Sequence, residues 1–139
     1  MTSTSTIAKQ QIADKVELWT QMLCEALKQN YITYCINMHK RSISKDGDVT
    51  NYHAECIDKL MNGESDYDFV IESGRKYHKI VMVNNQRSAH AFVDKQTGEV
   101  YKAASWKAPA KGVRFDLRII NQREYVLEKC DWSGGYLYS

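Results

Sequence analysis

The sequence predicts an α+β fold, with two N-terminal helices followed by an antiparallel β-meander, a short C-terminal helix and a final strand. Three observations support this fold class. Apolar residues recur every three or four positions in residues 7–30, and a second helical pattern follows the turn SKDGD. Short β-branched and aromatic runs, separated by turn-forming residues, fill residues 67–102. The length of 139 residues is that of a single domain, 1–139, in which we expect residues 1–6 to be a flexible tail.

The first helix is predicted over residues 7–30, with Ser5 or Thr6 as its N-terminal cap. Its apolar face consists of Ile12, Val16, Trp19, Leu23 and Leu27. The next stretch, YITYCINMHK, alternates apolar and polar residues with period two. This alternation favours a half-buried strand over residues 31–40 and leaves a helix as the alternative.

Two shorter helices are also predicted. The stretch VTNYHAECIDKLMNG indicates a second helix, capped by Thr50 or Asn51 and ended by Gly63. Residues 121–129 indicate a third.

The sheet is predicted from the runs YDFVIES, KYHKIVMVN, SAHAFVD and EVYKA. The separators GRK, NNQR and KQTG are turns, and the last of them joins Val93 to Val100 in a hairpin with Gly98 at positive φ. The final Tyr-Leu-Tyr is expected to form a strand. Tyr136 and Tyr138 would then point to the same side, for core packing or a subunit contact.

The composition is that of an ordinary globular protein, with 43% hydrophobic and 26% charged residues and a net charge of +2. No C-x-x-C pair occurs, so we expect reduced thiols rather than a zinc site or disulfides. The cysteines are Cys24, Cys35, Cys56 and Cys130. The N-terminus lacks a signal-peptide pattern and no apolar run approaches the ~18 residues of a membrane span, so we expect a cytoplasmic protein.

No catalytic signature is found: H-E-x-x-H, G-x-S-x-G, the Walker loop and G-x-G-x-x-G are all missing from the sequence. Glu99 and Lys102 are three residues apart, so on a strand they face opposite sides and do not make a metal-dependent nuclease site. Four single histidines are scattered, and His90 is expected to be a packed or hydrogen-bonded sheet residue rather than a general base. We therefore expect a protein that is not an enzyme and needs neither metal nor cofactor.

The stretch VYKAASWKAPAKGVRFDLR, residues 100–118, concentrates positive charge around the single proline, Pro109. Five cations and one anion give it a local net charge of +4, which leaves −2 for the rest of the chain. Arg114 and Arg118 are four residues apart and share a face on either a helix or a strand, an arrangement that suits two phosphates of one ligand. The candidate ligand-binding residues are Phe92, Trp106, Lys107, Lys111, Arg114 and Arg118.

In this hypothesis the arginines hold phosphates, Lys107 or Lys111 adds positive potential, and Phe92 or Trp106 stacks on a base. The alternative from the residues alone is a solvated basic loop with Trp106 inserted in the core. Acidic residues on the predicted strands would repel a long nucleic-acid backbone, so a small phosphorylated ligand is expected in preference to nucleic acid.

The stretch SAHAFVDKQTGEVYKAASWKAPAKGVRFDL, together with DWSGGYLY, resembles a family of small bacteriophage proteins. They share a hairpin HAFVD-x-x-TG-x-VYK, the phrase ASWKAPAKGVR and the ending DW-x-GGYLY. The family is similar to the Thoeris anti-defence sponges, phage proteins that bind a cyclic ADP-ribose-type immune signal without cleaving it. The resemblance implies paired helices plus an antiparallel sheet, assembly as a dimer or larger oligomer, and a pocket of arginines and an aromatic residue. Phe92, Arg114 and Arg118 are the positions able to fill those roles.

The expected function is therefore the sequestration of a cyclic nucleotide signal in the cytoplasm of an infected cell. Three alternatives stay open from the sequence: a phage inhibitor that binds a host protein, a small nucleic-acid-binding protein, and a small hydrolase of nucleotide signals.

Overall fold

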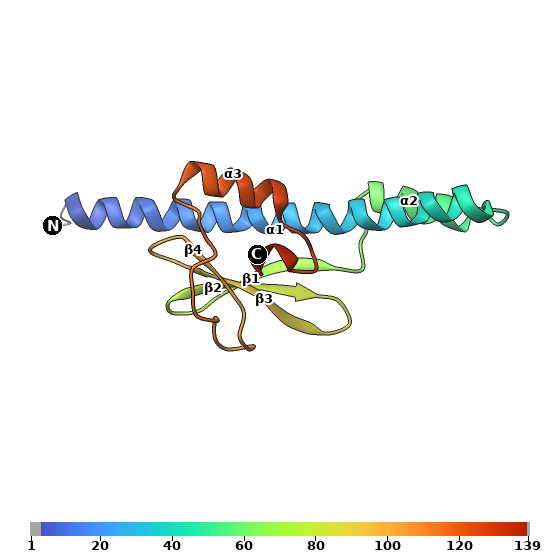
Figure 1. The fold of residues 1–139 in the computed structure, drawn as a ribbon. Coiled ribbons are helices and arrows are strands. Elements are labelled where there is room, and N and C mark those ends of the chain that lie inside the picture. Colours follow the sequence, from blue (N-terminus) through green and yellow to red (C-terminus); the bar gives the residue numbers. More distant parts are fainter. Residues whose placement is uncertain (1–3, 139) are drawn as a thin grey trace.

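The computed structural model describes residues 4–138 and confirms an α+β fold, in which a small sheet packs against the middle of one long helix (Figure 1). The elements are α1 (Thr4–Asp46), α2 (Tyr52–Met61), β1 (Asp68–Ser73), β2 (Tyr77–Val83), β3 (Arg87–Asp94), β4 (Glu99–Lys102), β5 (Phe115–Asp116), α3 (Ile120–Lys129) and the 3₁₀ helix η1 (Gly135–Leu137). Both ends of α1 extend past the sheet, which makes the molecule elongated.

Helix α1 runs without interruption through the stretch predicted to be a strand, so the strand over residues 31–40 and the helix end near residue 30 were wrong. The reason is that α1 changes partner along its length. Leu27 packs in the core with the sheet. Further along α1, Ile32 and Cys35 are buried against Leu60 of α2. A second helix, rather than a neighbouring strand, thus covers the apolar residues of this segment.

The expected N-terminal tail is also shorter than predicted. Helix α1 begins at Thr4, so residues 4–6 are helical and Thr6 lies inside the helix. Residues 1–3 of that predicted tail lie outside the described residues.

Helix α2 forms where it was predicted, but its cap differs. Asn51 has a left-handed conformation, with φ 61°, and its side chain makes no capping bond. Instead the Asp48 carboxylate accepts hydrogen bonds from the backbone N–H groups of His53, at 3.1 Å, and Ala54, at 2.8 Å. Burial alone would raise the pKa of Asp48, but the hydrogen bonds from Ala54 and His53 outweigh it and lower that pKa.

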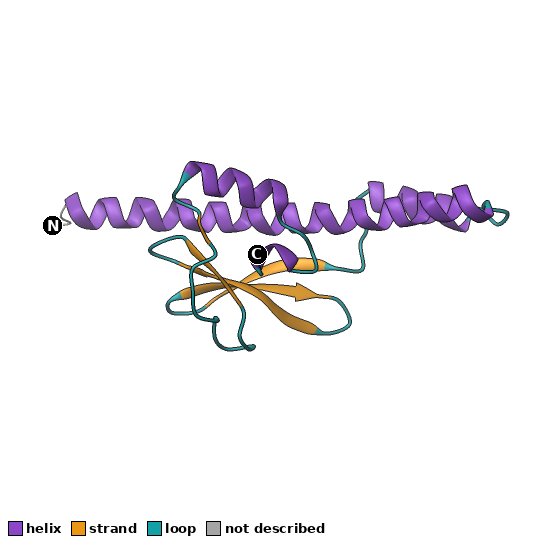
Figure 2. Ribbon diagram, viewed as in Figure 1, coloured by secondary structure: helices purple, strands orange, loops and turns teal. Residues whose placement is uncertain are grey.

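The five strands form an antiparallel meander in the order β1-β2-β3-β4-β5, as predicted for its first four members (Figure 2). The β3–β4 hairpin pairs Val93 with Val100, and Gly98 adopts φ +73° in its turn, which confirms that prediction. The two-residue strand β5 was not predicted. It adds Phe115 opposite Val100 at the sheet edge.

One face of the sheet forms the core with α1 and α3. Residues from all layers are fully buried there: Val16, Leu23 and Leu27 of α1, Ile80, Val93 and Val100 of the sheet, and Val126 of α3. The C-terminus closes this core. All four cysteines are free thiols.

The C-terminal Tyr-Leu-Tyr is not a strand. Gly134, at φ +85°, turns the chain, and the Asp131 carboxylate accepts hydrogen bonds from the backbone N–H groups of Gly135 and Tyr136. These bonds wind η1, which buries Tyr136 and leaves Tyr138 68% exposed. The two tyrosines therefore do not share an environment, contrary to the sequence-based prediction.

Candidate functional site

The basic stretch 100–118 forms the end of β4, a closed loop and β5. The loop is pinned at its base by a bridge between Ala103 and Pro109 and by a hydrogen bond of 2.7 Å from Ala110 N to the Lys102 carbonyl oxygen. Lys107 and Lys111 lie on this loop and are exposed to solvent. Neither lysine forms an ion pair with a residue in 4–138, so both contribute charge but no fixed contact.

Two predicted stacking residues occupy different environments. Trp106 is 40% exposed, and the Lys79 ammonium lies 3.6 Å from its ring centroid while donating a hydrogen bond of 2.9 Å to its carbonyl oxygen. Trp106 is thus not inserted in the core, and its ring is already in contact with the Lys79 ammonium. Phe92 is only 3% exposed, because Tyr77 packs edge-on against its ring and Tyr101 pairs with it across the strands. It has no face open to a ligand.

The two predicted arginines have different surroundings: Arg118 is paired with Asp116, whereas Arg114 forms no ion pair with a described residue. After β5 the chain turns, with a hydrogen bond from Ile119 N to the Asp116 carbonyl oxygen, so the regular strand or helix that would align the two side chains is interrupted. The guanidinium of Arg118 donates to both carboxylate oxygens of Asp116, through Nε at 3.3 Å and Nη2 at 3.1 Å. The hydrogen bond to Asp116 raises the pKa of Arg118. The guanidinium of Arg118 therefore already has an anionic partner, the Asp116 carboxylate.

Arg114 is different. It is half-buried, and its Nε is the one buried side-chain nitrogen or oxygen of residues 4–138 without a hydrogen-bond partner. None of the ion pairs within that part of the chain includes it. Buried charges in proteins are ordinarily paired or hydrogen-bonded, because removing them from water is costly. Arg114 is therefore a cation held in place without an anion.

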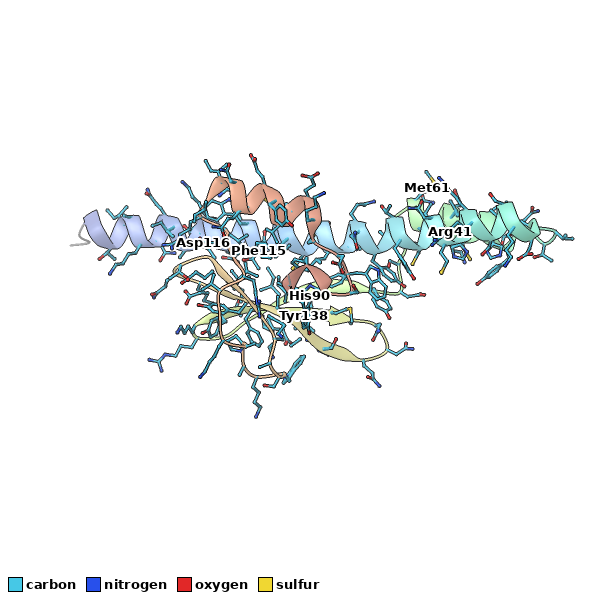
Figure 3. The ribbon with its side chains drawn as sticks, in the orientation of Figure 1. Arg41, Met61, His90, Phe115, Asp116 and Tyr138 are labelled. Atoms are coloured by element: carbon cyan, nitrogen blue, oxygen red, sulfur yellow. The ribbon has the colours of Figure 1, made fainter. Side chains whose placement is uncertain are left out.

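The Arg114 side chain lines an open hollow of about 500 Å³ between β5 and the start of α3, which we call the Arg114 hollow. Its other lining residues are Phe115, Asn121, Gln122 and Tyr125. The rings of Phe115 and Tyr125 lie 5.9 Å apart, and Tyr125 is 51% exposed. Figure 3 shows Phe115 and Asp116 at this edge of the sheet, beside α1 and α3.

One amide side chain of the hollow, that of Gln122, is positioned by the fold. Gln122 Oε1 accepts a hydrogen bond of 2.8 Å from Asp116 N, which fixes its side chain against β5. No described residue receives a hydrogen bond from the Gln122 amide nitrogen. The hollow thus combines one unpaired cation, one exposed ring and side-chain amides. This set matches an anionic ligand that also carries a flat, hydrogen-bonding ring.

A row of rings runs from this hollow into the molecule. Phe115 stacks on Tyr136 with 6.1 Å between centroids, and Tyr136 stacks on His90 at 5.7 Å. The His90 Nε2 and the Tyr136 hydroxyl are 2.8 Å apart, so they share a hydrogen bond. Burial lowers the pKa of His90 to about 4, which keeps the ring neutral at pH 7. His90 is therefore a packed, hydrogen-bonded residue, as the sequence predicted.

Sequence reasoning found Arg114 but missed Tyr125, Asn121 and Gln122. A usable signal was present: Asn121 and Tyr125 are four residues apart in a segment predicted to be helical, so they share a face. The packing of that helix beside β5 could not be predicted from the local sequence. Among residues 4–138 no group of three or more histidine, cysteine, aspartate or glutamate side chains is arranged to hold a metal ion.

The fold and the hollow define a small α+β protein with a long helix, a five-stranded meander and a solvent-open hollow lined by an arginine that has no ion-pair partner among the described residues. The chain belongs to a family of unknown function, DUF7717, whose family model matches residues 3–139. No curated protein and no solved structure matches it. Despite the length of α1, none of the helices within residues 4–138 has an apolar run suited to crossing a bilayer.

Proposed function

We propose that this protein is a non-enzymatic binder that sequesters a small phosphorylated nucleotide, of the cyclic ADP-ribose class, in the Arg114 hollow. The observation that carries the proposal is the half-buried Arg114 guanidinium, which has no anion among the described residues and lies beside an exposed aromatic ring. A ligand phosphate supplies the missing anion. The partner is thus a small molecule rather than a nucleic-acid polymer.

Each part of such a ligand meets a matching group. The guanidinium of Arg114 binds phosphate oxygens through charge-assisted hydrogen bonds. The half-exposed ring of Tyr125 provides a stacking surface for adenine, a contact worth about 1–3 kcal/mol per base in nucleic-acid complexes. The amides of Asn121 and Gln122 are of the type that pairs with the adenine edge. Because Asp116 occupies Arg118, one arginine, not two, makes the fixed phosphate contact.

The biological role that fits this binding is that of a phage sponge acting in the cytoplasm of an infected cell. The support comes from the resemblance of residues 88–117 and 131–138 to the small phage proteins, and through them to the Thoeris anti-defence sponges. A protein of this kind must bind its signal tightly but need not catalyse a reaction on it. To lower a micromolar pool of signal to a small fraction, it needs a Kd near nanomolar, which corresponds to a binding free energy of about −12 kcal/mol.

Isothermal titration with cyclic ADP-ribose isomers tests the proposal. We expect binding by the native chain and a loss of at least about tenfold for Arg114→Gln, because one charge-assisted contact is removed. Lys111→Gln is the matched control, since it removes an exposed cation of the same basic stretch. Mass spectrometry of the ligand released by heating should find it intact. No heat at any micromolar concentration, or equal loss in both variants, would contradict the proposal.

A further inference from the structure

We propose a second ligand site, for a small monocarboxylate with an apolar body, in a hollow of about 290 Å³ between β3, β4 and the C-terminal turn. We call it the C-terminal hollow. Met82, Leu137 and Trp132 contribute apolar surface to it, Ser88 and Ser133 contribute hydroxyl groups, and Lys102 contributes an ammonium. This proposal does not depend on the nucleotide proposal, because the Arg114 hollow shares none of these lining residues.

The C-terminal turn meets strands β2, β3 and β4 at this hollow. His90 comes from the β3 run, Lys102 from the end of β4, and Trp132 and Tyr138 from the C-terminal turn. Figure 3 shows His90 and Tyr138 close together at the centre of the molecule. Gly134 lies at its wall, where an added Cβ would be 3.7 Å from the His90 ring. The C-terminal turn thus packs against β3, and the surface between them is concave.

The charge of the C-terminal hollow comes from a single group. Lys102 is the one lysine or arginine in its lining, and none of the ion pairs within residues 4–138 includes it. Its ammonium lies 4.3 Å from the Tyr138 ring centroid, so a cation–π contact holds it at the rim without neutralising it. His90 is neutral at pH 7, and Asp131 directs its carboxylate to the Gly135 and Tyr136 N–H groups. Among residues 4–138, one positive charge therefore faces the hollow, and it selects one negative charge.

The shape and surface set the rest of the ligand. The volume equals the liquid share of roughly ten water molecules, which suits a single ring or a short alkyl chain. Ligand sites are mostly apolar with a few convergent polar groups, and this hollow has that composition. Ser88 is exposed and Ser133 already donates to Asp131, so the hydroxyl groups add orientation rather than charge. An apolar carboxylate fits these features, with its charged end at Lys102.

Phenylacetate is a suitable probe, and phenylacetamide is its neutral isostere. We expect phenylacetate, titrated into the ¹⁵N-labelled full chain at pH 7, to shift the amide resonances of Lys102, Ser133 and Gly134 in a saturable way. Phenylacetamide should bind about tenfold more weakly, because it lacks the charge-assisted contact with Lys102. Lys102→Met should weaken phenylacetate by a similar factor and leave phenylacetamide unchanged.

The control variant is Lys111→Met, which removes an exposed lysine outside the hollow and should leave both affinities unchanged. The spectrum of Lys102→Met without ligand reports whether the fold is kept. Were it lost, Lys102→Arg, which keeps the charge, should bind phenylacetate in preference to the amide. Equal affinities for the two probes, shifts confined to the Arg114 hollow, or no saturable shift up to about 10 mM would overturn the proposal.

Discussion

Arg114 is a half-buried cation that has no anionic partner among residues 4–138. We predict that Arg114→Met leaves the free energy of unfolding unchanged or raises it by up to about 1 kcal/mol, since removing an unpaired charge relieves its desolvation. Urea unfolding of the two proteins measures this. A fall of more than about 1 kcal/mol would mean that Arg114 serves the fold rather than a ligand.

His90 gives a prediction about pH. Its pKa is about 4 in the folded chain against an ordinary value of 6.5, because burial disfavours the imidazolium. The unfolded chain therefore binds more protons between these values, and stability is full above pH 6.5 and falls as the pH drops toward 4. The expected loss from this one group is on the order of 2–3 kcal/mol.

The measurement is the free energy of unfolding at several pH values between 4.5 and 7.5, for the native chain and for His90→Gln. The glutamine variant should have the shallower pH dependence in this window, whatever its stability at pH 7. Burial also lowers the pKa of His78, but His78 is present in both proteins, so the difference isolates His90. Equal slopes for the two proteins would mean that His90 does not titrate as described.

At this scale the sequence identified some residues and not others for definite reasons. Arg114 stood out because the local charge of its stretch is unusual, a property that needs no tertiary information. Phe92 was misjudged because Tyr77 and Tyr101, which cover it, come from neighbouring strands. The pairing of Arg118 could be predicted from the sequence, because Asp116 lies two residues away and is the only acid of the stretch.

Helix α1 has residues packed in the core and residues exposed to solvent. Leu23 is fully buried in the core, whereas Leu18 is 54% exposed on the same helix. We predict that Leu23→Ala lowers the free energy of unfolding by about 2–5 kcal/mol, because it leaves a cavity. Measured at a concentration low enough for the chain to be monomeric, Leu18→Ala should change it by less than about 0.5 kcal/mol. Chemical denaturation compares the pair, and similar losses in both variants would contradict the assigned faces.

Some elements are determined by their local sequence, and others by contacts with residues elsewhere in the chain. The meander was predictable because each strand carries its own β-branched run and each turn its own residues, as with Gly98. The helical state of residues 31–40 was not, because the partner of Ile32 and Cys35 is Leu60, which follows a turn. The C-terminal turn depends on hydrogen bonds to Asp131, and the apolar pattern of Tyr136 to Tyr138 does not encode them.

The whole molecule exposes more surface than a compact protein of its mass. Its accessible surface is 9026 Å², whereas the usual scaling gives about 7,400 Å² for 16.1 kDa. The excess follows from the ends of α1, which project past the sheet on both sides (Figure 1). Residues 6–12 of α1 are exposed on every side. A helical end of this length has little stability of its own in water, so a covering partner is expected.

We propose that a second copy of the chain covers α1. Ile7, Leu18 and Met22 are 48%, 54% and 43% exposed, and their spacings of eleven and four residues place them on one face. Light scattering should therefore give the mass of a dimer, and Leu18→Glu with Met22→Glu should give a monomer. Met61→Glu, on α2 and 73% exposed, is the control that should stay dimeric. A monomeric native chain at about 100 µM would exclude this interface.

The row of rings from Phe115 through Tyr136 to His90 connects the two hollows, because Phe115 lines the Arg114 hollow and His90 lines the C-terminal hollow. Stacked rings cannot tilt independently. A ligand that reorients the ring at one end of the row therefore changes the free energy of reorienting the ring at the other end. Occupancy on one side should then alter affinity on the other by a factor that is identical in both directions, as thermodynamic linkage requires. Titrating each compound in the presence and absence of the other would measure that factor, and a value of one would show that the two hollows bind independently.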